Sequence, residues 1–383
     1  MPIEELTRNA VDVLPEDGLE AKLKLGRPLR VKLGIDVTSP DIHLGRGIPL
    51  QRMRAFQDEG HKAVFIVGDY TTRIGDPSGR SSERPILSDE EIDANAKVYL
   101  EQAKTILRDD PELLEVRYNG EWLSKLSYAD VVRLGRIVTV ARILERDDFE
   151  KRYRAGEPIS VSELLYPLMQ AYDSVAIEAD VELGGTDQLY NLLAGREVME
   201  AYGLEPQVVL TTPLLLSWDG EKMSSSVGNN VPLTAAPEEM FGRTMRIPDS
   251  QLEEWWTLVA ERPVPEGDPL EAKLELARLI VTRSHGEGAA RAAEEHFTRV
   301  VRRGEAPEDV PERSLPSGDP VHLPALLAEA FGLSTSEARR LIEQGGVKVD
   351  GDPVSELDVS RARLAGAVLQ AGKRRFVRLN EAA

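Results

Sequence analysis

Three short polar stretches contain the residue types that bind nucleotide phosphates. They are residues 43–46 (His-Leu-Gly-Arg), which follow Thr38, residues 184–188 (Gly-Gly-Thr-Asp-Gln) and residues 222–226 (Lys-Met-Ser-Ser-Ser). Glycine lets backbone N–H groups approach an anion closely, and Lys, Arg and His side chains donate to phosphate oxygens. Each stretch alone is equally consistent with a helix start, a tight turn or a surface loop. Their occurrence together in this order is much less expected by chance, so they indicate a nucleotide site.

The elements around these stretches predict an α/β fold with a parallel sheet. Residues 31–36 form an apolar strand, and residues 62–70 are an almost wholly apolar run that is typical of a central parallel strand. Together they make a βαβ unit, and further strands are expected near residues 116–119, 181–188 and 208–210. Because parallel strands end at the same edge of a sheet, the polar stretches are expected at that edge, where ligands bind in open α/β sheets.

The remaining segments predict helices and further domains. Helices that connect the strands are expected at residues 88–109, 127–155 and 160–178. The predicted organisation is a catalytic domain (1–232), an all-helical domain (233–304), a Pro-rich acidic linker (305–320) and a small α+β domain (321–383). The last domain is expected to have helices at 323–331 and 335–344 and short strands at 347–349 and 376–379.

The composition excludes several classes of protein. The 383 residues are enough for two or three domains, and the sequence has no run of 18 apolar residues that would span a membrane. The acidic amino terminus lacks the apolar core of a secretory signal, so we expect a cytoplasmic protein that does not bind membranes. Cysteine is absent and the five histidines are scattered, so neither disulfides nor a tightly bound metal is expected.

The charge is distributed unevenly along the chain. The net charge of −19 argues against a general affinity for nucleic acids. Residues 321–383, however, contain nine Lys/Arg and eight Asp/Glu, a net charge of +1, which leaves −20 for residues 1–320. A polyanion is therefore expected to meet local basic patches, chiefly in the carboxyl-terminal domain.

Together the motifs resemble those of bacterial tyrosyl-tRNA synthetases, which are class I aminoacyl-tRNA synthetases. Residues 43–46 stand where this family has its HIGH motif, and residues 222–226 stand where it has KMSKS. Residues 166–173 (Tyr-Pro-Leu-Met-Gln-Ala-Tyr-Asp) and 184–188 resemble its tyrosine-binding helix and loop, and residues 75–80 match another family segment. The tail resembles the RNA-binding domain shared with ribosomal small-subunit protein four. The likeness runs nearly end to end and implies a Rossmann-like catalytic domain and a tyrosine–tRNA ligase.

The resemblance also implies roles for individual residues. Catalytic contacts with the phosphates are implied for Thr38, His43, Arg46, Lys222, Arg80 and Arg84. Nucleotide binding is implied for Gly34, Asp36, His43, Gly45, Gly185, Asp187, Lys222, Met223 and Ser224. Tyrosine binding is implied for Lys32, Asp36, Thr71, Asp76, Tyr166, Gln170, Asp173 and Gln188. Asp173 is expected to accept the phenolic hydroxyl, and phenylalanine is expected to be a poor substrate because it would leave that carboxylate unpaired.

The implied partners are L-tyrosine, ATP accompanied by Mg²⁺, and tRNA(Tyr). Phosphates of the RNA are expected to meet Arg339, Arg340, Lys373, Arg374 and Arg375, and the alternative for these side chains is an ordinary solvated face. The family also implies a homodimer whose interface lies within residues 119–160. The apolar residues of that segment would otherwise be ordinary core.

Three residues depart from the family pattern. Arg46 replaces the second His of HIGH, Ser225 replaces the second Lys of KMSKS, and Lys32 stands where one branch has Tyr beside the substrate hydroxyl. A guanidinium is larger than an imidazole and always charged, so Arg46 could take over the phosphate contact that Ser225 does not offer.

Two other functions stay open at this point. One is an RNA-binding protein that has lost catalysis, which the complete tyrosine-site pattern disfavours. The other is a paralogue that adenylates tyrosine, or a related amino acid, for a pathway without tRNA, which the RNA-binding tail disfavours.

Overall fold

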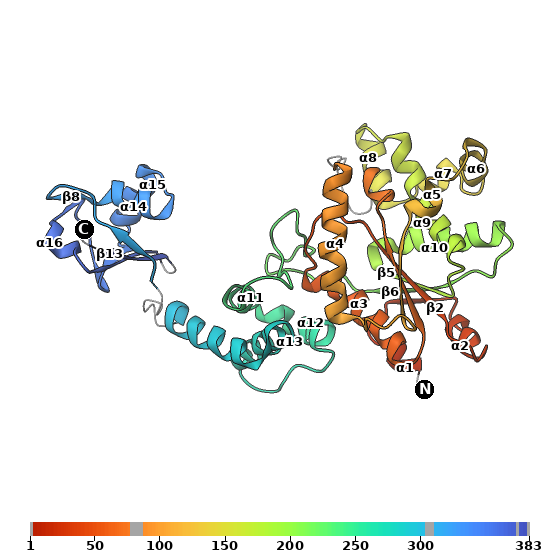
Figure 1. Ribbon diagram of the computed structural model, residues 1–383, viewed down its shortest axis with the longest axis horizontal. Helices are drawn as coiled ribbons and strands as arrows, with labels where there is room; N and C mark the ends of the chain where they lie inside the picture. Colours follow the sequence, from red (N-terminus) through yellow and green to blue (C-terminus); the bar gives the residue numbers. More distant parts are fainter. Residues whose placement is uncertain (1–2, 77–86, 303–309, 373–374, 381–383) are drawn as a thin grey trace. The chain divides into compact units, whose positions relative to one another are not determined.

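The computed structural model describes residues 3–76, 87–302, 310–372 and 375–380 (Figure 1). Four predicted site residues, Arg80, Arg84, Lys373 and Arg374, therefore lie outside the described residues. The chain forms two compact units. The first comprises residues 1–235 and 246–276, and the second comprises residues 236–245 and 277–383, so the predicted helical domain is divided between them.

A six-stranded sheet lies at the centre of the first unit, in the order β1-β6-β5-β2-β3-β4. The strands are β1 (Asp12–Leu14), β2 (Arg30–Ile35), β3 (Lys62–Val67), β4 (Leu114–Tyr118), β5 (Val181–Gly185) and β6 (Val208–Thr212). Strands β2 to β6 pair in parallel, which confirms the predicted α/β sheet. Strand β1 is antiparallel to β6 and was not among the predicted strands.

The connections between the strands create a switch point in the sheet. From β2 the chain proceeds outward through β3 and β4, and it then returns to the other side of β2 through β5 and β6. Strands β2 and β5 are therefore neighbours, and Val31 pairs with Val181. Ligands of open α/β sheets bind at the carboxyl ends of such a strand pair.

Helices cover both faces of this sheet (Figure 1). Successive side chains of a strand point to opposite faces, and along β3 Phe65 belongs to one apolar cluster and Ile66 to another. The Phe65 cluster includes residues of α3 (Leu44–Asp58) and α4 (Asp89–Ile106). The Ile66 cluster includes the residue that follows α9 (Val161–Ala176), so α9 lies on the opposite face.

The expected long helix at residues 127–155 is wrong. The segment forms three short helices, α6 (Tyr128–Leu134), α7 (Val140–Ile143) and α8 (Asp147–Ala155). The side chains of Ser127 and Thr139 accept hydrogen bonds from backbone N–H groups at the starts of α6 and α7, which favours new helix starts at these points. They are preceded by α5 (Gly120–Leu123).

Several further helices complete the two units. They are α1 (Ile3–Leu6), α2 (Gly18–Leu23), α10 (Leu189–Ala201), α11 (Pro237–Thr244), α12 (Leu252–Trp255) and α13 (Pro269–Phe297). Helix α13 is interrupted at Gly286, whose φ of 85° is open to glycine but strained for other residues.

The carboxyl-terminal part of the second unit has a five-stranded sheet in the order β10-β9-β12-β13-β7 and a two-stranded sheet of β8 and β11. The strands are β7 (Glu312–Ser314), β8 (Val321–His322), β9 (Val347–Val349), β10 (Asp352–Pro353), β11 (Asp358–Val359), β12 (Val368–Ala371) and β13 (Arg375–Asn380). The helices are α14 (Leu323–Phe331), α15 (Thr335–Glu343) and α16 (Arg361–Leu364). Strand β7 pairs with β13 although it lies within the predicted linker, and the buried Leu315 fixes this end to the core.

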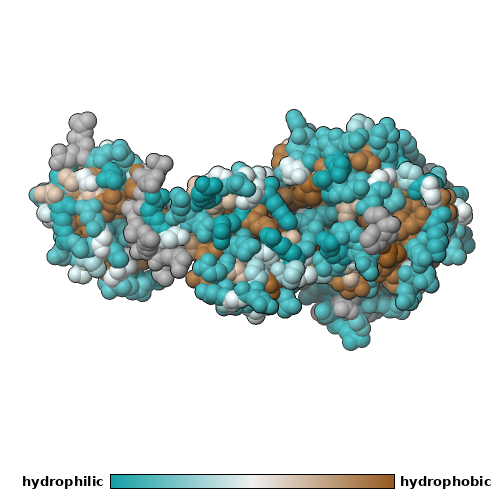
Figure 2. Space-filling model, turned by 90° about the horizontal axis from the view of Figure 1, so that it is seen from below, coloured by the Kyte–Doolittle hydropathy of each residue, from teal (hydrophilic) through white to brown (hydrophobic). Residues whose placement is uncertain are grey.

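On the face shown in Figure 2, most of the side chains are hydrophilic, and apolar patches lie between them. Charged residues make up 30% of the sequence, which accounts for this appearance. Among the residues that the structure describes, no helix is both long and apolar enough to cross a membrane.

Candidate active site

A cavity of about 930 Å³ lies at the carboxyl ends of β2 and β5. Its walls contain most of the residues that we predicted for the site. These are Gly34, Asp36, Thr38, His43, Gly45, Arg46, Thr71, Asp76, Tyr166, Gln170, Asp173, Gly185, Asp187, Gln188, Lys222, Met223 and Ser224. The three polar stretches, far apart in sequence, therefore meet at one place, and the volume suits a nucleotide together with a small molecule.

His43 begins α3 and is held as a neutral imidazole. Its Nδ1 accepts the backbone N–H of Arg46 at 3.3 Å, so the ring's remaining proton is on Nε2. Burial, together with the nearby charges of Arg46 and Lys222, lowers the pKa of His43 to about 3. His43 can therefore donate one hydrogen bond to an anion but adds no positive charge at neutral pH.

Arg46 supplies positive charge from the first turn of the same helix. Its Nη1 lies 3.2 Å from Ser39 Oγ and 3.4 Å from the carbonyl oxygen of Asp41. The guanidinium also lies over the ring of the buried Tyr99, 5.6 Å from the centroid. These partners are neutral, so they hold the guanidinium at the cavity wall without cancelling its charge.

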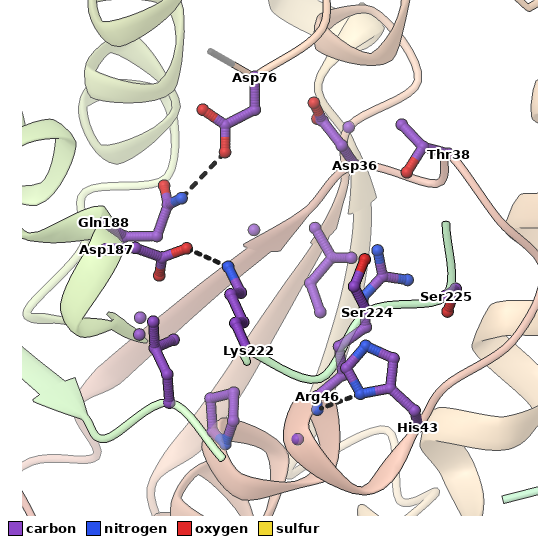
Figure 3. A pocket seen from close by; sticks show the side chains of 18 of the residues that line it. Asp36, Thr38, His43, Arg46, Asp76, Asp187, Gln188, Lys222, Ser224 and Ser225 are labelled. Carbon is purple, nitrogen blue, oxygen red and sulfur yellow. Dashed lines mark hydrogen bonds and ion pairs between the residues drawn. The ribbon is translucent and has the colours of Figure 1, made fainter. Parts of the chain in front are cut away.

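Lys222 provides the second permanent cation among the described residues that line the cavity, and it is ion-paired with Asp187. Figure 3 shows this pair, and next to it the hydrogen bond of 2.9 Å from Gln188 Nε2 to Asp76 Oδ2. The loop of Lys222 is anchored by Met223, which is buried and whose N–H donates to the carbonyl of Leu215 at 3.0 Å. A polyanion that binds near Lys222 would therefore compete with Asp187.

A chain of hydrogen bonds crosses the opposite end of the cavity. The Tyr166 hydroxyl donates to Asp36 Oδ2 at 3.1 Å, and Thr71 Oγ1 donates to Asp36 Oδ1 at 2.7 Å. Asn119 Nδ2 lies 3.0 Å from Thr71 Oγ1 and 3.3 Å from Asp173 Oδ2. Asp36 was predicted for both ligands, and its described contacts lie on this side, with the residues predicted to bind tyrosine.

Asp173 ends this chain as a buried carboxylate that faces the cavity. It is 3% exposed, and its Oδ1 accepts the indole N–H of Trp122 at 2.8 Å. Burial raises the pKa of Asp173 to about 7, although the charge of Lys32 and the hydrogen bonds from Trp122 and Asn119 oppose the rise. A carboxylate so desolvated gains most from a ligand that donates a hydrogen bond to it.

The structure contradicts the predicted contact between Lys32 and the substrate. Lys32 is fully buried, and its Nζ donates to Gln170 O at 2.8 Å, to Ser174 Oγ at 2.7 Å and to Glu182 Oε1 at 2.7 Å. An ammonium has three N–H donors, and these partners use all of them. Lys32 therefore lies behind the cavity wall rather than in the cavity.

Two residues of this network were absent from the predicted site. Asn119 follows directly after β4, so its position at the carboxyl edge of the sheet could have identified it as a site residue. Trp122 lies in the short helix α5, and no sequence pattern pointed to it. Ser225, noted for its departure from KMSKS, also lines the cavity.

Among the predicted RNA-binding residues, the described ones lie in the carboxyl-terminal sheet and its helices. Arg339 and Arg340 are exposed on α15, and Arg375 is exposed at the start of β13. Hydrogen bonds from Ser334 lower the pKa of Glu337, and the charges of Arg340 and Arg375 add smaller effects in the same direction. No group of three or more His, Asp or Glu side chains in the described ranges could hold a metal ion.

Two family models match parts of the sequence. Residues 24–303 match the family model described as tRNA synthetases class I (W and Y), and residues 323–358 match that of the S4 domain. The chain is 48% identical to a tyrosine–tRNA ligase of Moorella thermoacetica, over 98% of this chain and 94% of that protein. It is 51% identical to the tyrosine–tRNA ligase of Cupriavidus pinatubonensis, over 92% and 88%.

Solved structures support the same fold. The crystal structure of tyrosyl-tRNA synthetase with L-tyrosine from Archaeoglobus fulgidus has a TM-score of 0.59 at 23% identity, covering 76% of this chain and 98% of that chain. A truncated mitochondrial tyrosyl-tRNA synthetase from Aspergillus nidulans has a TM-score of 0.61 at 23% identity, covering 76% and 91%.

Proposed function

Because the chain belongs to the class I tRNA synthetases for tryptophan and tyrosine, we propose that it ligates L-tyrosine to tRNA(Tyr). A carboxylate oxygen of tyrosine attacks the α-phosphorus of ATP, and pyrophosphate leaves. The terminal ribose hydroxyl of the tRNA then attacks the carbonyl carbon of tyrosyl-adenylate, and AMP leaves. The curated relatives with this activity, similar to this chain over nearly its whole length, support the proposal.

The observation that carries the choice of amino acid is the buried carboxylate of Asp173. A phenolic hydroxyl placed against it would donate a charge-assisted hydrogen bond, and a phenyl ring would leave the carboxylate with no such donor. Gln170 and Tyr166 come from the same helix as Asp173. Asp76 also lines the cavity and accepts a hydrogen bond from Gln188. We assign these polar groups to the ammonium and carboxylate of tyrosine.

The end of the cavity that carries His43, Arg46 and Lys222 is assigned to ATP, which enters with Mg²⁺ bound to its phosphates. Asp187 and Gly185 would hold the ribose, and the backbone at Gly45 would contact the adenine. Thr38, the Nε2–H of His43, Arg46 and Lys222 would face the phosphates, with Lys222 exchanging Asp187 for a phosphate oxygen. Charge builds up on these oxygens as pyrophosphate leaves, so fixed donors and cations there lower the barrier.

Exchange of labelled pyrophosphate into ATP tests the proposal. We expect exchange that depends on L-tyrosine, with kcat/KM for L-phenylalanine about 100-fold lower because the buried Asp173 would lack the phenolic donor. Absence of tyrosine-dependent exchange would refute the proposal. Exchange without formation of tyrosyl-tRNA would instead favour a paralogue that adenylates tyrosine for another acceptor.

The S4 domain is proposed to bind the tRNA backbone through Arg339, Arg340 and Arg375. The double substitution Arg339→Glu and Arg340→Glu in the full chain should lower kcat/KM for tRNA charging about tenfold at physiological salt. It should also reduce the slope of log(kcat/KM) against log[salt] by about one for each arginine that contacts a phosphate. Pyrophosphate exchange should be unchanged.

A control with the same charge change in the first unit is Arg54→Glu with Arg108→Glu, because both arginines pair with Asp58 at the surface. This control should charge tRNA nearly normally. If both double variants reduced charging equally, net charge rather than the S4 domain would be responsible.

A homodimer is also proposed, with the interface within residues 119–160. The support is the exposed apolar side chains of this segment, Tyr128, Val132, Val140 and Tyr153, which are 47–84% exposed. Since aminoacyl-tRNA is consumed by ribosomes, the proposed activity also implies a cytoplasmic enzyme.

A further inference from the structure

A buried ion pair lies directly behind the wall that carries Asp173. Lys32 on β2 and Glu182 on β5 are paired residues of adjacent parallel strands, and both are at most 1% exposed. Their charged atoms are 2.7 Å apart. Glu182 is completed by Ser174 Oγ and by Gln207 Nε2, each at 2.7 Å from Oε2. The sheet of the first unit thus contains two opposite charges, and all the described hydrogen-bond partners of both charges are protein groups.

The pair is connected to helix α9 at the turn that faces the cavity. The ammonium of Lys32 binds the carbonyl oxygen of Gln170 and the hydroxyl of Ser174, which lie one helical turn apart. Asp173 lies between these two positions in the sequence, and both Gln170 and Asp173 line the cavity. The position of the ammonium is therefore fixed relative to the carboxylate of Asp173.

The groups packed around Asp173 are of two kinds. Asn119 and Trp122, from the end of β4 and from α5, are neutral donors that bind its two oxygens. Lys32 from β2 and Glu182 from β5 act on it through their charges, and Lys32 has the larger effect. Asp36 is farther along the chain of hydrogen bonds, behind Thr71 and Asn119. In an interior of low dielectric, such nearby charges act strongly.

We propose that Lys32 is a positioning residue that keeps Asp173 negatively charged for the phenol of tyrosine, and that Glu182 limits this effect. The proposal rests on the proposed function, since Asp173 has to receive the phenolic hydroxyl. Lys32 acts from behind the wall, because all its donors are engaged by Gln170, Ser174 and Glu182. This role also gives a reason for a buried lysine at this position that does not contact a ligand.

The test is the pH dependence of kcat/KM for tyrosine in pyrophosphate exchange, which reports groups of the free enzyme. For the unsubstituted protein we expect kcat/KM to fall as the pH drops below about 7, because Asp173 takes up a proton. Lys32→Met should shift this acid limb upward by about one pH unit. The loss is then about fivefold at pH 7 and about tenfold well below pH 7, and it is largely recovered at pH 9. Glu182→Gln should shift the limb downward, because an anion near Asp173 is removed.

The double variant Lys32→Met with Glu182→Gln separates charge from packing. It removes both charges, and since Lys32 has the larger effect on Asp173, its acid limb should lie between those of the unsubstituted protein and Lys32→Met. If Lys32→Met does not fold, Glu182→Gln and the double variant still provide two shifts of opposite sign.

A purely structural role for the pair predicts a different result. Each variant would then lose activity equally at every pH, with the acid limb unmoved, and that outcome would overturn the proposal. Any other order of the limbs would also overturn it. Absence of tyrosine-dependent exchange in the unsubstituted protein would instead refute the proposed function, so the two failures are distinguishable.

Discussion

Replacing Asp173 with Asn is expected to lower kcat/KM for L-tyrosine about tenfold in pyrophosphate exchange and, at the same time, to stabilise the protein. The loss of activity follows because the phenol would donate to a neutral amide instead of a buried carboxylate. A hydrogen bond to a charged group contributes about 1.5–3 kcal/mol, against about 0.5–1.5 kcal/mol for one between neutral groups. The ratio of tyrosine to phenylalanine activity should fall by a similar factor. kcat/KM for ATP should change little, because Asp173 lies at the tyrosine end of the cavity.

The gain in stability follows from the pKa of Asp173. The pKa is about 7 in the folded protein against an ordinary value of 3.8, so between pH 4 and 7 the folded state keeps a proton that the unfolded chain has lost. Stability therefore falls as the pH rises through this range, and the ionised carboxylate is unfavourable by about 4 kcal/mol above pH 7. Asn removes this penalty but loses one of the two hydrogen bonds from Asn119 and Trp122. We expect a net gain of about 1–3 kcal/mol at pH 8 that shrinks as the pH approaches 4.

Denaturant unfolding at pH 8 and pH 5 measures this gain, and Asp180→Asn is the matched control. Asp180 is equally buried, and burial raises its pKa, but hydrogen bonds from Arg27 and the N–H of Arg30 outweigh burial and lower it. Its replacement should therefore destabilise the protein at pH 8 and leave the KM for tyrosine unchanged. A destabilised Asp173→Asn protein at pH 8 would contradict the pKa that burial gives this residue.

Replacing Arg46 with Ala is expected to lower kcat for pyrophosphate exchange by about 10²–10³-fold, the effect of losing one fixed donor to a charged transition state. Among the described residues that line the cavity, the permanently charged cations are Arg46 and Lys222. Lys222 is paired with the carboxylate of Asp187, whereas the described partners of Arg46 are neutral. His43 contributes no charge, since its pKa is about 3. The charge of Arg46 is therefore the one most fully available to the phosphates.

Two further variants make this second prediction specific. Ser225 lines the same cavity, so Ser225→Lys in the Arg46→Ala background should restore about tenfold of kcat by supplying a cation to the same phosphates. Arg54→Ala, on the same helix but paired with Asp58 at the surface, should leave kcat within about twofold. A kcat for Arg46→Ala within threefold of the unsubstituted protein would show that the phosphates do not depend on this guanidinium.

Sequence patterns predicted the parallel strands because burial on both faces leaves a continuous apolar signal, as in residues 62–67. Strand β1 was not predicted, since it has three residues and is specified by its pairing with β6 rather than by its own pattern. The prediction of one helix over residues 127–155 failed for a different reason. Apolar spacing continued through the segment, while the cap at Thr139 divided it.

The site was predictable where the family motif itself faces the cavity, as for His43, Asp173 and Lys222. Lys32 was predicted to contact tyrosine because its position in the sequence places it on a strand that ends at the cavity. The sequence alone does not show which groups surround its side chain. Side chains alternate along β2, and Lys32 points to the face that carries α9, where Glu182 neutralises it. Trp122 could not be predicted, because its hydrogen bond to Asp173 depends on how α5 packs after β4.

The pairing of β2 with β5 has a consequence for when the cavity can first exist. Val31 and Val181 are 150 positions apart, and the cavity lies at the ends of the two strands on which they stand. Contacts between residues so distant in sequence form only after a long loop closes, and folds that depend on them acquire their structure slowly. During synthesis the segment of His43 therefore emerges long before its partner strand. The newly made chain should bind nucleotide only after β5 has joined the sheet and the loop of Lys222 has followed, so ATP affinity would report the assembly of this sheet.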